Sequence, residues 1–210
     1  MDEPRIPRRP AMLDPARAEA IVGDEDPAAG SAVAHTAAWA LLGVGDEELG
    51  TDAVERLRRV VRSEGVDVIA HVWSRSPEFT LPGALWRLYL LEEWYQRDRL
   101  AVETRYEEGL GAQIVPGLEQ PVRARNLESV MDEVSSMLRG DLTDDDLDWV
   151  LAAAAKVLRI VAAGETHGAS WIVDPSDPLA YPVTTRAKAL LRTAEELDAA
   201  SREAQVGALE

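Results

Sequence analysis

Glu92 is a carboxylate with apolar neighbours in the sequence, which could give it a catalytic or metal-binding role. It lies on a heptad-like stripe through residues 80–109, TLPGALWRLYLLEEWYQRDRLAVETRYEEG, in which leucines, tyrosines and a valine occupy most of the other positions. A partly buried carboxyl group has a raised pKa and can serve as a general acid or a metal ligand. Glu92, Glu93 and His71 are therefore the candidate catalytic residues. The alternative is a structural ion pair of Glu92 or Glu93 with an arginine, such as Arg97, four residues after Glu93.

Other motifs that carry chemistry are missing from the sequence. The three histidines form no local metal motif, because no two are three or four residues apart and no HExxH occurs. The acidic run 141–148 lacks the glycine and the distal glutamate of a calcium loop, and it is typical of a helix N-terminus. The loop 165–183 contains serine, histidine and aspartate, but no nucleophile motif surrounds Ser170. We predict no metal and no cofactor.

Aromatic side chains provide a second kind of candidate, a protein-binding surface. Trp171 and Tyr181 lie in a long proline-rich loop. Such a loop is either anchored onto helices or used to dock a partner. Trp73 and Phe79 would join this surface if they are exposed. Because Trp and Tyr are enriched at binding hot spots, we predict a protein partner or self-association through Trp171, Tyr181, Trp73 and Phe79.

Composition narrows the classes of function. The chain has 210 residues, with 22 Lys and Arg against 38 Asp and Glu, and a net charge of -16. Such a charge repels phosphate backbones, so nucleic-acid binding is not expected. The absence of cysteine excludes disulfides and thiolate chemistry and fits a reducing compartment. No apolar run is long enough to cross a membrane, and we expect a cytoplasmic protein.

One stretch resembles a known family in the order of its parts. Residues 55–94, ERLRRVVRSEGVDVIAHVWSRSPEFTLPGALWRLYLLEEW, resemble the opening of TetR-like repressors, and this resemblance implies DNA binding. The stretch departs from the family in three ways: it does not open the chain, SRSPEFTLPG replaces the short turn, and the helix that follows is apolar. The family is not assigned, and a DNA-binding regulator remains an alternative. That alternative requires one exposed basic patch, formed by Arg56, Arg58, Arg59 and Arg62.

The elements that would position these residues are all helices. Helix-capping side chains, helix-breaking glycines and apolar periodicity predict an all-α class, a single-domain bundle of about seven or eight helices around a long central helix at 80–109. That helix begins at the cap Thr80 and stops at Gly109. The other helices are expected at 14–23, 31–43, 51–65, 67–77, 126–140, 143–164 and from Thr184 or Thr185 onward.

The domain organisation follows from the breaks between these helices. Residues 1–13 are expected to form an arm without its own fold, and 14–204 a single all-α domain. The irregular stretch 110–125 is a possible sub-boundary, and 205–210 is a C-terminal tail. With no catalytic motif, the leading prediction is a non-enzymatic protein-interaction or regulatory module. The alternative from another class is an enzyme or small-ligand binder with a carboxylate pocket beside the central helix, and an unpaired acid against that helix would favour it.

Overall fold

The computed structural model describes residues 27–45, 50–170 and 172–210. In these ranges the chain forms helices and no strand, which confirms the all-α class. The arm at 1–13, the helix expected at 14–23 and Trp171 lie outside the described residues. The helices are α2 (Pro27–Leu41), α3 (Thr51–Glu64), α4 (Asp67–Trp73), α5 (Leu81–Arg97), α6 (Arg99–Leu110), α7 (Leu127–Leu138), the 3-10 turn η1 (Asp144–Asp146), α8 (Leu147–His167) and α9 (Ala180–Gln205).

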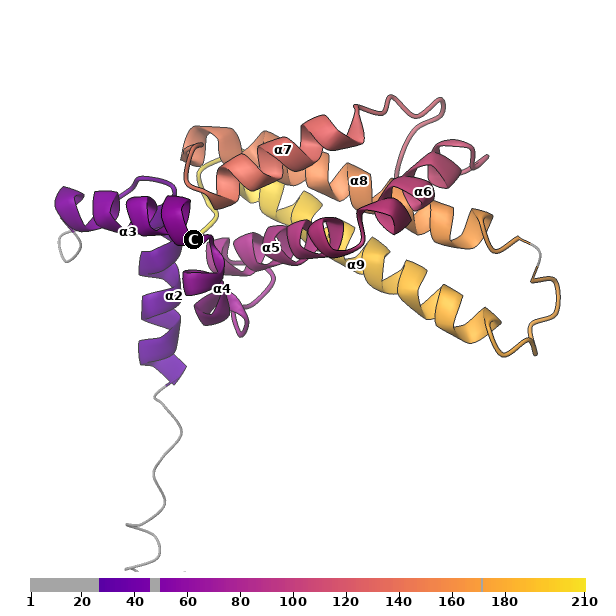
Figure 1. Ribbon diagram of the computed structural model, residues 1–210, viewed down its shortest axis with the longest axis horizontal. Coiled ribbons are helices and arrows are strands. Elements are labelled where there is room, and N and C mark those ends of the chain that lie inside the picture. Colours follow the sequence, from indigo (N-terminus) through magenta and orange to yellow (C-terminus); the bar gives the residue numbers. More distant parts are fainter. Residues whose placement is uncertain (1–26, 46–49, 171) are drawn as a thin grey trace, which may run out of the picture.

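The helices are arranged around α5, which runs through the middle of the molecule (Figure 1). α2, α3 and α4 gather at one end of α5, and α6 continues from its other end. α8 and α9 form the most extensive helix pair and extend as a hairpin beyond α6. Buried side chains from α2 to α9 belong to one apolar cluster. This packing puts α5 in contact with α2, α4, α7, α8 and α9.

The start of α5 follows from its sequence. Thr80 caps the helix, because its hydroxyl oxygen accepts a hydrogen bond from the Gly83 amide at 3.2 Å. Pro82 lies in the first turn, where no N–H is needed for the helix ladder. The expected stripe is buried at its leucines, at Glu92 and at Tyr95, so the central position of this segment is confirmed.

The segment 80–109 is helical but is not one continuous helix. Asp98 has φ -142° and ψ 55°, which lies outside the helical region, so α5 ends at Arg97 and α6 begins at Arg99. The Asp98 amide still donates to the Trp94 carbonyl at 2.9 Å. The break redirects the chain, and α6 packs along α8. Arg99, expected on the core-facing stripe, is exposed because it follows the break.

Two glycines that were expected to end helices lie inside them instead. α6 continues one residue past Gly109, and α8 continues past Gly164 to His167. A Cβ atom on Gly109 would lie 1.9 Å from the Ile160 carbonyl oxygen, and one on Gly164 would lie 1.8 Å from that of Arg105. Both glycines are therefore contact points at which the backbones of α6 and α8 touch.

α9 begins earlier than expected, at Ala180 instead of Thr184 or Thr185. Pro182 is no obstacle, because a proline in a first turn removes an N–H that has no helical partner. At its other end α9 stops at Gln205, and the residues assigned to a tail turn back onto the bundle. Leu209 is buried, and the Glu210 carbonyl accepts a hydrogen bond from the Leu81 amide at 2.7 Å.

Across the described ranges, none of the helices combines the length and the apolar character that a membrane crossing requires.

Candidate functional site

Glu92 faces α7 from the middle of α5 and is only 9% exposed. Its Oε1 accepts a hydrogen bond from Gln96 Nε2 at 2.9 Å, whereas its Oε2 is buried without a hydrogen-bond partner. Burial raises the pKa of Glu92, and Gln96, the Ser135 hydroxyl and the charge of Arg139 counteract this only in part. Among the ion pairs of the described residues, none includes Glu92.

Tyr95 lies one turn further along α5 on the same face. It is buried, its hydroxyl has no hydrogen-bond partner, and the Arg99 guanidinium lies over its ring at 5.2 Å. Burial raises the pKa of Tyr95. We call Glu92, Tyr95 and Ser135 the α5–α7 polar seam. In the part of the chain that the structure describes, no group of three potential ligands could hold a metal ion.

The other two candidate catalytic residues lie apart from this seam. Glu93 forms the expected ion pair with Arg97, with a separation of 2.5 Å between Oε2 and Nη2. His71 is exposed on α4, and its carbonyl accepts a hydrogen bond from the Ser74 hydroxyl. The groups that act on Glu92 come from α5 and α7. The three predicted residues are thus not brought together into one catalytic site.

The candidate partner-binding residues divide according to burial. Trp73 is fully buried in the core, so the exposure on which its place in a partner surface depended is not met. It ends the short α4, and α4 is pressed between α2, α3 and α5. Phe79 and Tyr181 are exposed. For Trp171 the prediction falls outside the described residues.

Three exposed apolar side chains lie in the short stretch where α8 turns into α9. Val173 is 89% exposed, Leu179 51% and Tyr181 79%. We call residues 172–181 the hairpin tip; it lies at the far end of the α8–α9 hairpin in Figure 1. Sequence reasoning found Tyr181 but missed Val173 and Leu179, whose available signal was apolar residues scattered between prolines.

Local hydrogen bonds give the hairpin tip a defined shape. The Asp174 carboxylate accepts from the Ser176 amide and hydroxyl, each at 2.8 Å. The Asp177 carboxylate accepts from the Leu179 amide at 2.8 Å. These bonds fold the two aspartates back onto their own turns, and the apolar side chains are left facing outward.

A buried carboxylate fixes the base of the tip. Glu165 of α8 lies 3.6 Å from Arg105 of α6 and 3.4 Å from Arg186 of α9. One charge thus connects three helices close to the point where the tip begins. Two further exposed apolar residues are Leu110, at the end of α6, and Ile114, in the connection that follows it.

The four arginines proposed as a basic patch do not act as a set. Arg58 Nε donates to the Gly140 carbonyl at 2.9 Å, and Arg62 Nη2 donates to the same oxygen at 3.0 Å. Arg62 also pairs with Asp141. Two of the four guanidinium groups therefore join α3 to the turn before α8, and their hydrogen bonds to the protein make them less available to a phosphate backbone.

No protein-family model matches this chain, and no curated protein or solved structure matches it either.

Proposed function

We propose that this protein is a non-enzymatic helical module that binds a partner protein through the hairpin tip. The observation that carries the proposal is the exposure of Val173, Leu179 and Tyr181 within one short stretch. Single exposed apolar residues are ordinary, but a contiguous group at a protruding turn is a feature of binding surfaces. Tyrosine adds a large, rigid contact area with a polar end, which suits a hot spot.

The helices below the tip support this role because they hold it in place. α8 and α9 form the most extensive helix pair of the molecule, with an ion pair of 2.6 Å between Arg159 and Asp198 along its length. Glu165 anchors the same pair at the end near the tip. A surface that is ordered before binding loses less conformational entropy on association.

The charge around the tip indicates the chemistry of the partner. Asp174 and Asp177 flank the apolar side chains, and the whole chain carries a net charge of -16. A second copy would bring the same acidic rim against this one. We therefore infer a partner with an apolar centre and basic residues around it, because complementary charge speeds encounter and like charge opposes it.

Affinity capture with matched variants tests the proposal. The tip variant combines Val173→Ser with Tyr181→Ser, and the control combines Leu100→Ser with Val206→Ser, two residues that are similarly exposed elsewhere. We expect the control to retain a partner that the tip variant loses, and the captured partner to dissociate as salt is raised. An identical set of captured proteins for both variants would contradict the proposal. A dimer of the wild type in light scattering that the tip variant abolishes would reassign the partner to a second copy.

A second candidate, small-ligand capture at the α5–α7 polar seam, is favoured by the two buried polar atoms without partners. A ligand that donates hydrogen bonds would satisfy Glu92 Oε2 and the Tyr95 hydroxyl. A thermal-shift screen of metabolites tests it, since a ligand that binds the native state must raise the melting temperature. Stabilisation that disappears in Glu92→Gln supports this candidate, and a screen without a single stabilising compound contradicts it.

A further inference from the structure

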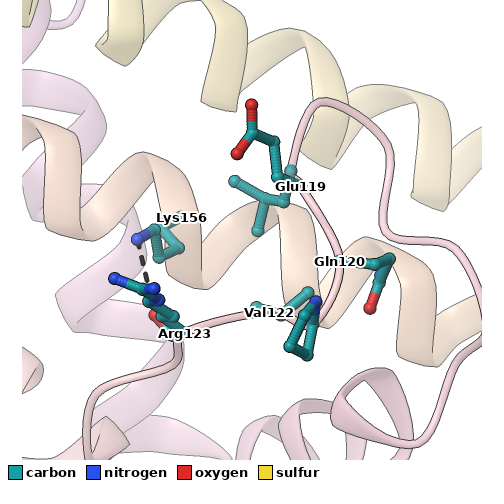
Figure 2. Close-up of a pocket in the computed structure, with 7 residues that line it drawn as sticks. Glu119, Gln120, Val122, Arg123 and Lys156 are labelled. Atoms are coloured by element: carbon teal, nitrogen blue, oxygen red, sulfur yellow. Dashed lines mark hydrogen bonds between the residues drawn. The ribbon is translucent and has the colours of Figure 1, made fainter.

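The connection between α6 and α7, residues 111–126, lies beside α8 and forms a half-open pocket with it (Figure 2). The pocket has a volume of about 390 Å³, within the usual range of small-ligand sites. It lies away from both the hairpin tip and the α5–α7 polar seam. Its lining consists of one run of the connection and one residue of α8: Leu118, Glu119, Gln120, Pro121, Val122, Arg123 and Lys156.

Contacts on both sides of this run hold the pocket open in a defined shape. Val115 is buried in the core, and the Pro116 carbonyl accepts from Arg159 Nη1 at 3.2 Å. At the other end the Tyr106 hydroxyl donates to the Arg125 carbonyl at 2.8 Å. The connection is therefore fastened before and after the pocket, so that its walls are formed without a ligand.

The floor of the pocket is apolar and its one wall is cationic. Leu118 and Val122 are half-buried and pack against the core. Figure 2 shows Lys156 and Arg123 next to each other on one side, with the Glu119 carboxylate apart from them. Lys156 Nζ lies 3.5 Å from the Arg123 carbonyl, a long contact for a hydrogen bond.

The charges of Arg123 and Lys156 are not neutralised by the protein. Most of the described arginines lie in ion pairs with carboxylates, as expected in a chain with a net charge of -16. No described carboxylate lies within ion-pair distance of Arg123 or Lys156. Two adjacent unpaired cations are thus concentrated at the pocket of an otherwise acidic protein.

We propose that this pocket binds a small molecule with an oxyanion head, a carboxylate or a phosphate, on a short apolar body. The guanidinium of Arg123 suits both heads because its fork matches two oxygens, and Lys156 adds a second charge. Leu118, Pro121 and Val122 contact the apolar body. This inference is independent of the proposed function, because it concerns different residues and a different ligand.

The lysine content of the chain provides a direct test. Lys156 and Lys188 are the two lysines of the sequence, and Lys188 lies on α9 outside the pocket. Reductive methylation with ¹³C-formaldehyde preserves the charge and gives each lysine its own NMR signal, assigned with Lys188→Arg. Titration with hexanoate and with hexyl phosphate is expected to shift the Lys156 signal saturably and to leave the Lys188 signal in place. The tighter of the two probes identifies the head group.

Two comparisons make the test decisive. Hexanol, which lacks the charge, is expected not to shift the Lys156 signal. By calorimetry, Lys156→Gln is expected to weaken probe binding about tenfold, as loss of one charge-assisted hydrogen bond would, and Lys188→Gln is expected to leave it unchanged. The same contrast is expected between Arg123→Gln and Arg202→Gln. Parallel shifts of both lysine signals, equal binding of hexanol, or no saturation at millimolar probe would each overturn the proposal.

Discussion

Glu92 is a buried carboxyl group whose hydrogen bonds are incomplete. One carboxyl oxygen accepts a hydrogen bond from Gln96, and the other is buried without a hydrogen-bond partner. An ionised carboxylate in such a place loses its hydration, and the charge of Arg139 compensates for this only in part, so the charged form is disfavoured. Either a ligand supplies the missing hydrogen bond to Glu92, or the buried carboxylate lowers the stability of the fold at neutral pH.

The pH dependence of stability distinguishes Glu92 from an ordinary surface acid. The pKa of Glu92 is raised in the folded state, so its contribution to stability is fully present below the unfolded value of about 4.3 and declines as the pH rises through the folded value. Glu92→Gln removes this decline. We expect the free energy of unfolding of the variant, relative to wild type, to be higher at neutral pH than at acidic pH. Urea unfolding of both proteins at the two pH values measures this difference.

The control for this prediction is Glu93→Gln, which removes a carboxylate that is paired with Arg97 on the neighbouring position of the same helix. This variant is expected to gain nothing at neutral pH. A Glu92→Gln variant that becomes less stable than wild type as the pH rises would show that the charged form of Glu92 is used in the fold.

Two buried tyrosines provide a second test at this scale. The Tyr95 hydroxyl has no partner, whereas the Tyr106 hydroxyl donates to the Arg125 carbonyl at 2.8 Å. Tyr106→Phe is expected to lower the free energy of unfolding by about 1 kcal/mol, and Tyr95→Phe to leave it unchanged or raise it. Urea unfolding of the two variants measures the difference. Equal losses would mean that the Tyr95 hydroxyl has a partner after all, such as an ordered water.

At the scale of elements, the contact between α6 and α8 depends on residues without side chains. The Cβ of an alanine at position 164 would lie 1.8 Å from the Arg105 carbonyl oxygen, and this neighbour is backbone that cannot rotate away. The two helices must separate to admit it. A larger separation also weakens the ion pairs of Glu165, which connect α6, α8 and α9 below the hairpin tip.

We therefore predict that Gly164→Ala lowers the free energy of unfolding by about 1–3 kcal/mol, the usual cost of overpacking. The matched control is Gly30→Ala in α2, where an added Cβ meets nothing within 4 Å. That variant is expected to raise stability by about 0.5–1 kcal/mol, because alanine is the better helix former. Thermal unfolding followed by circular dichroism compares the two. A stabilising Gly164→Ala would contradict the close helix contact.

The features that the sequence predicted correctly are those determined locally. Thr80 and Asn126 cap α5 and α7 with side-chain oxygens, and Thr143 forms a capping box with Asp146, all within three residues. The start of a helix can be predicted from the sequence because the capping residue and its partner are close together in the chain. The prediction that Gly109 and Gly164 end helices is wrong. Each glycine instead makes room for the backbone of a helix whose contacting residue is more than fifty residues away in the sequence.

The candidate site was predicted less completely, for the same physical reason. The apolar surroundings of Glu92 in the sequence correctly indicated burial, but the lack of a hydrogen-bond partner for its Oε2 depends on which part of α7 lies opposite. Trp73 and Tyr181 look alike as aromatic residues near prolines, and only packing shows that the first is buried and the second exposed. The pocket beside α8 is formed by a loop and a helix, and no local pattern in the sequence relates Arg123 to Lys156.

At the scale of the whole molecule, α9 joins the two ends of the bundle. It starts at the hairpin tip, beyond α6, and the residues that follow it reach the start of α5 (Figure 1). Along the way Glu196 pairs with Arg87 of α5 at 2.6 Å. The residues after α9 then turn onto α5, where the Glu210 carbonyl accepts a hydrogen bond from the Leu81 amide. That amide belongs to a first helical turn and has no acceptor within its own helix.

Leu209 holds this closure in place, since it is 4% exposed and belongs to the apolar cluster of the core. Leu209→Ala is expected to lower the free energy of unfolding by about 2–3 kcal/mol, within the range for truncation of a buried leucine. It is also expected to free the Leu81 amide, so that hydrogen exchange rises in the first turn of α5 and not in α7. Exchange measured by mass spectrometry, with the exposed Leu100→Ala as the control, separates this local release from general loosening. Unchanged exchange at the start of α5 would mean that α5 holds its position without the chain end, and that the bundle is closed by α9 alone.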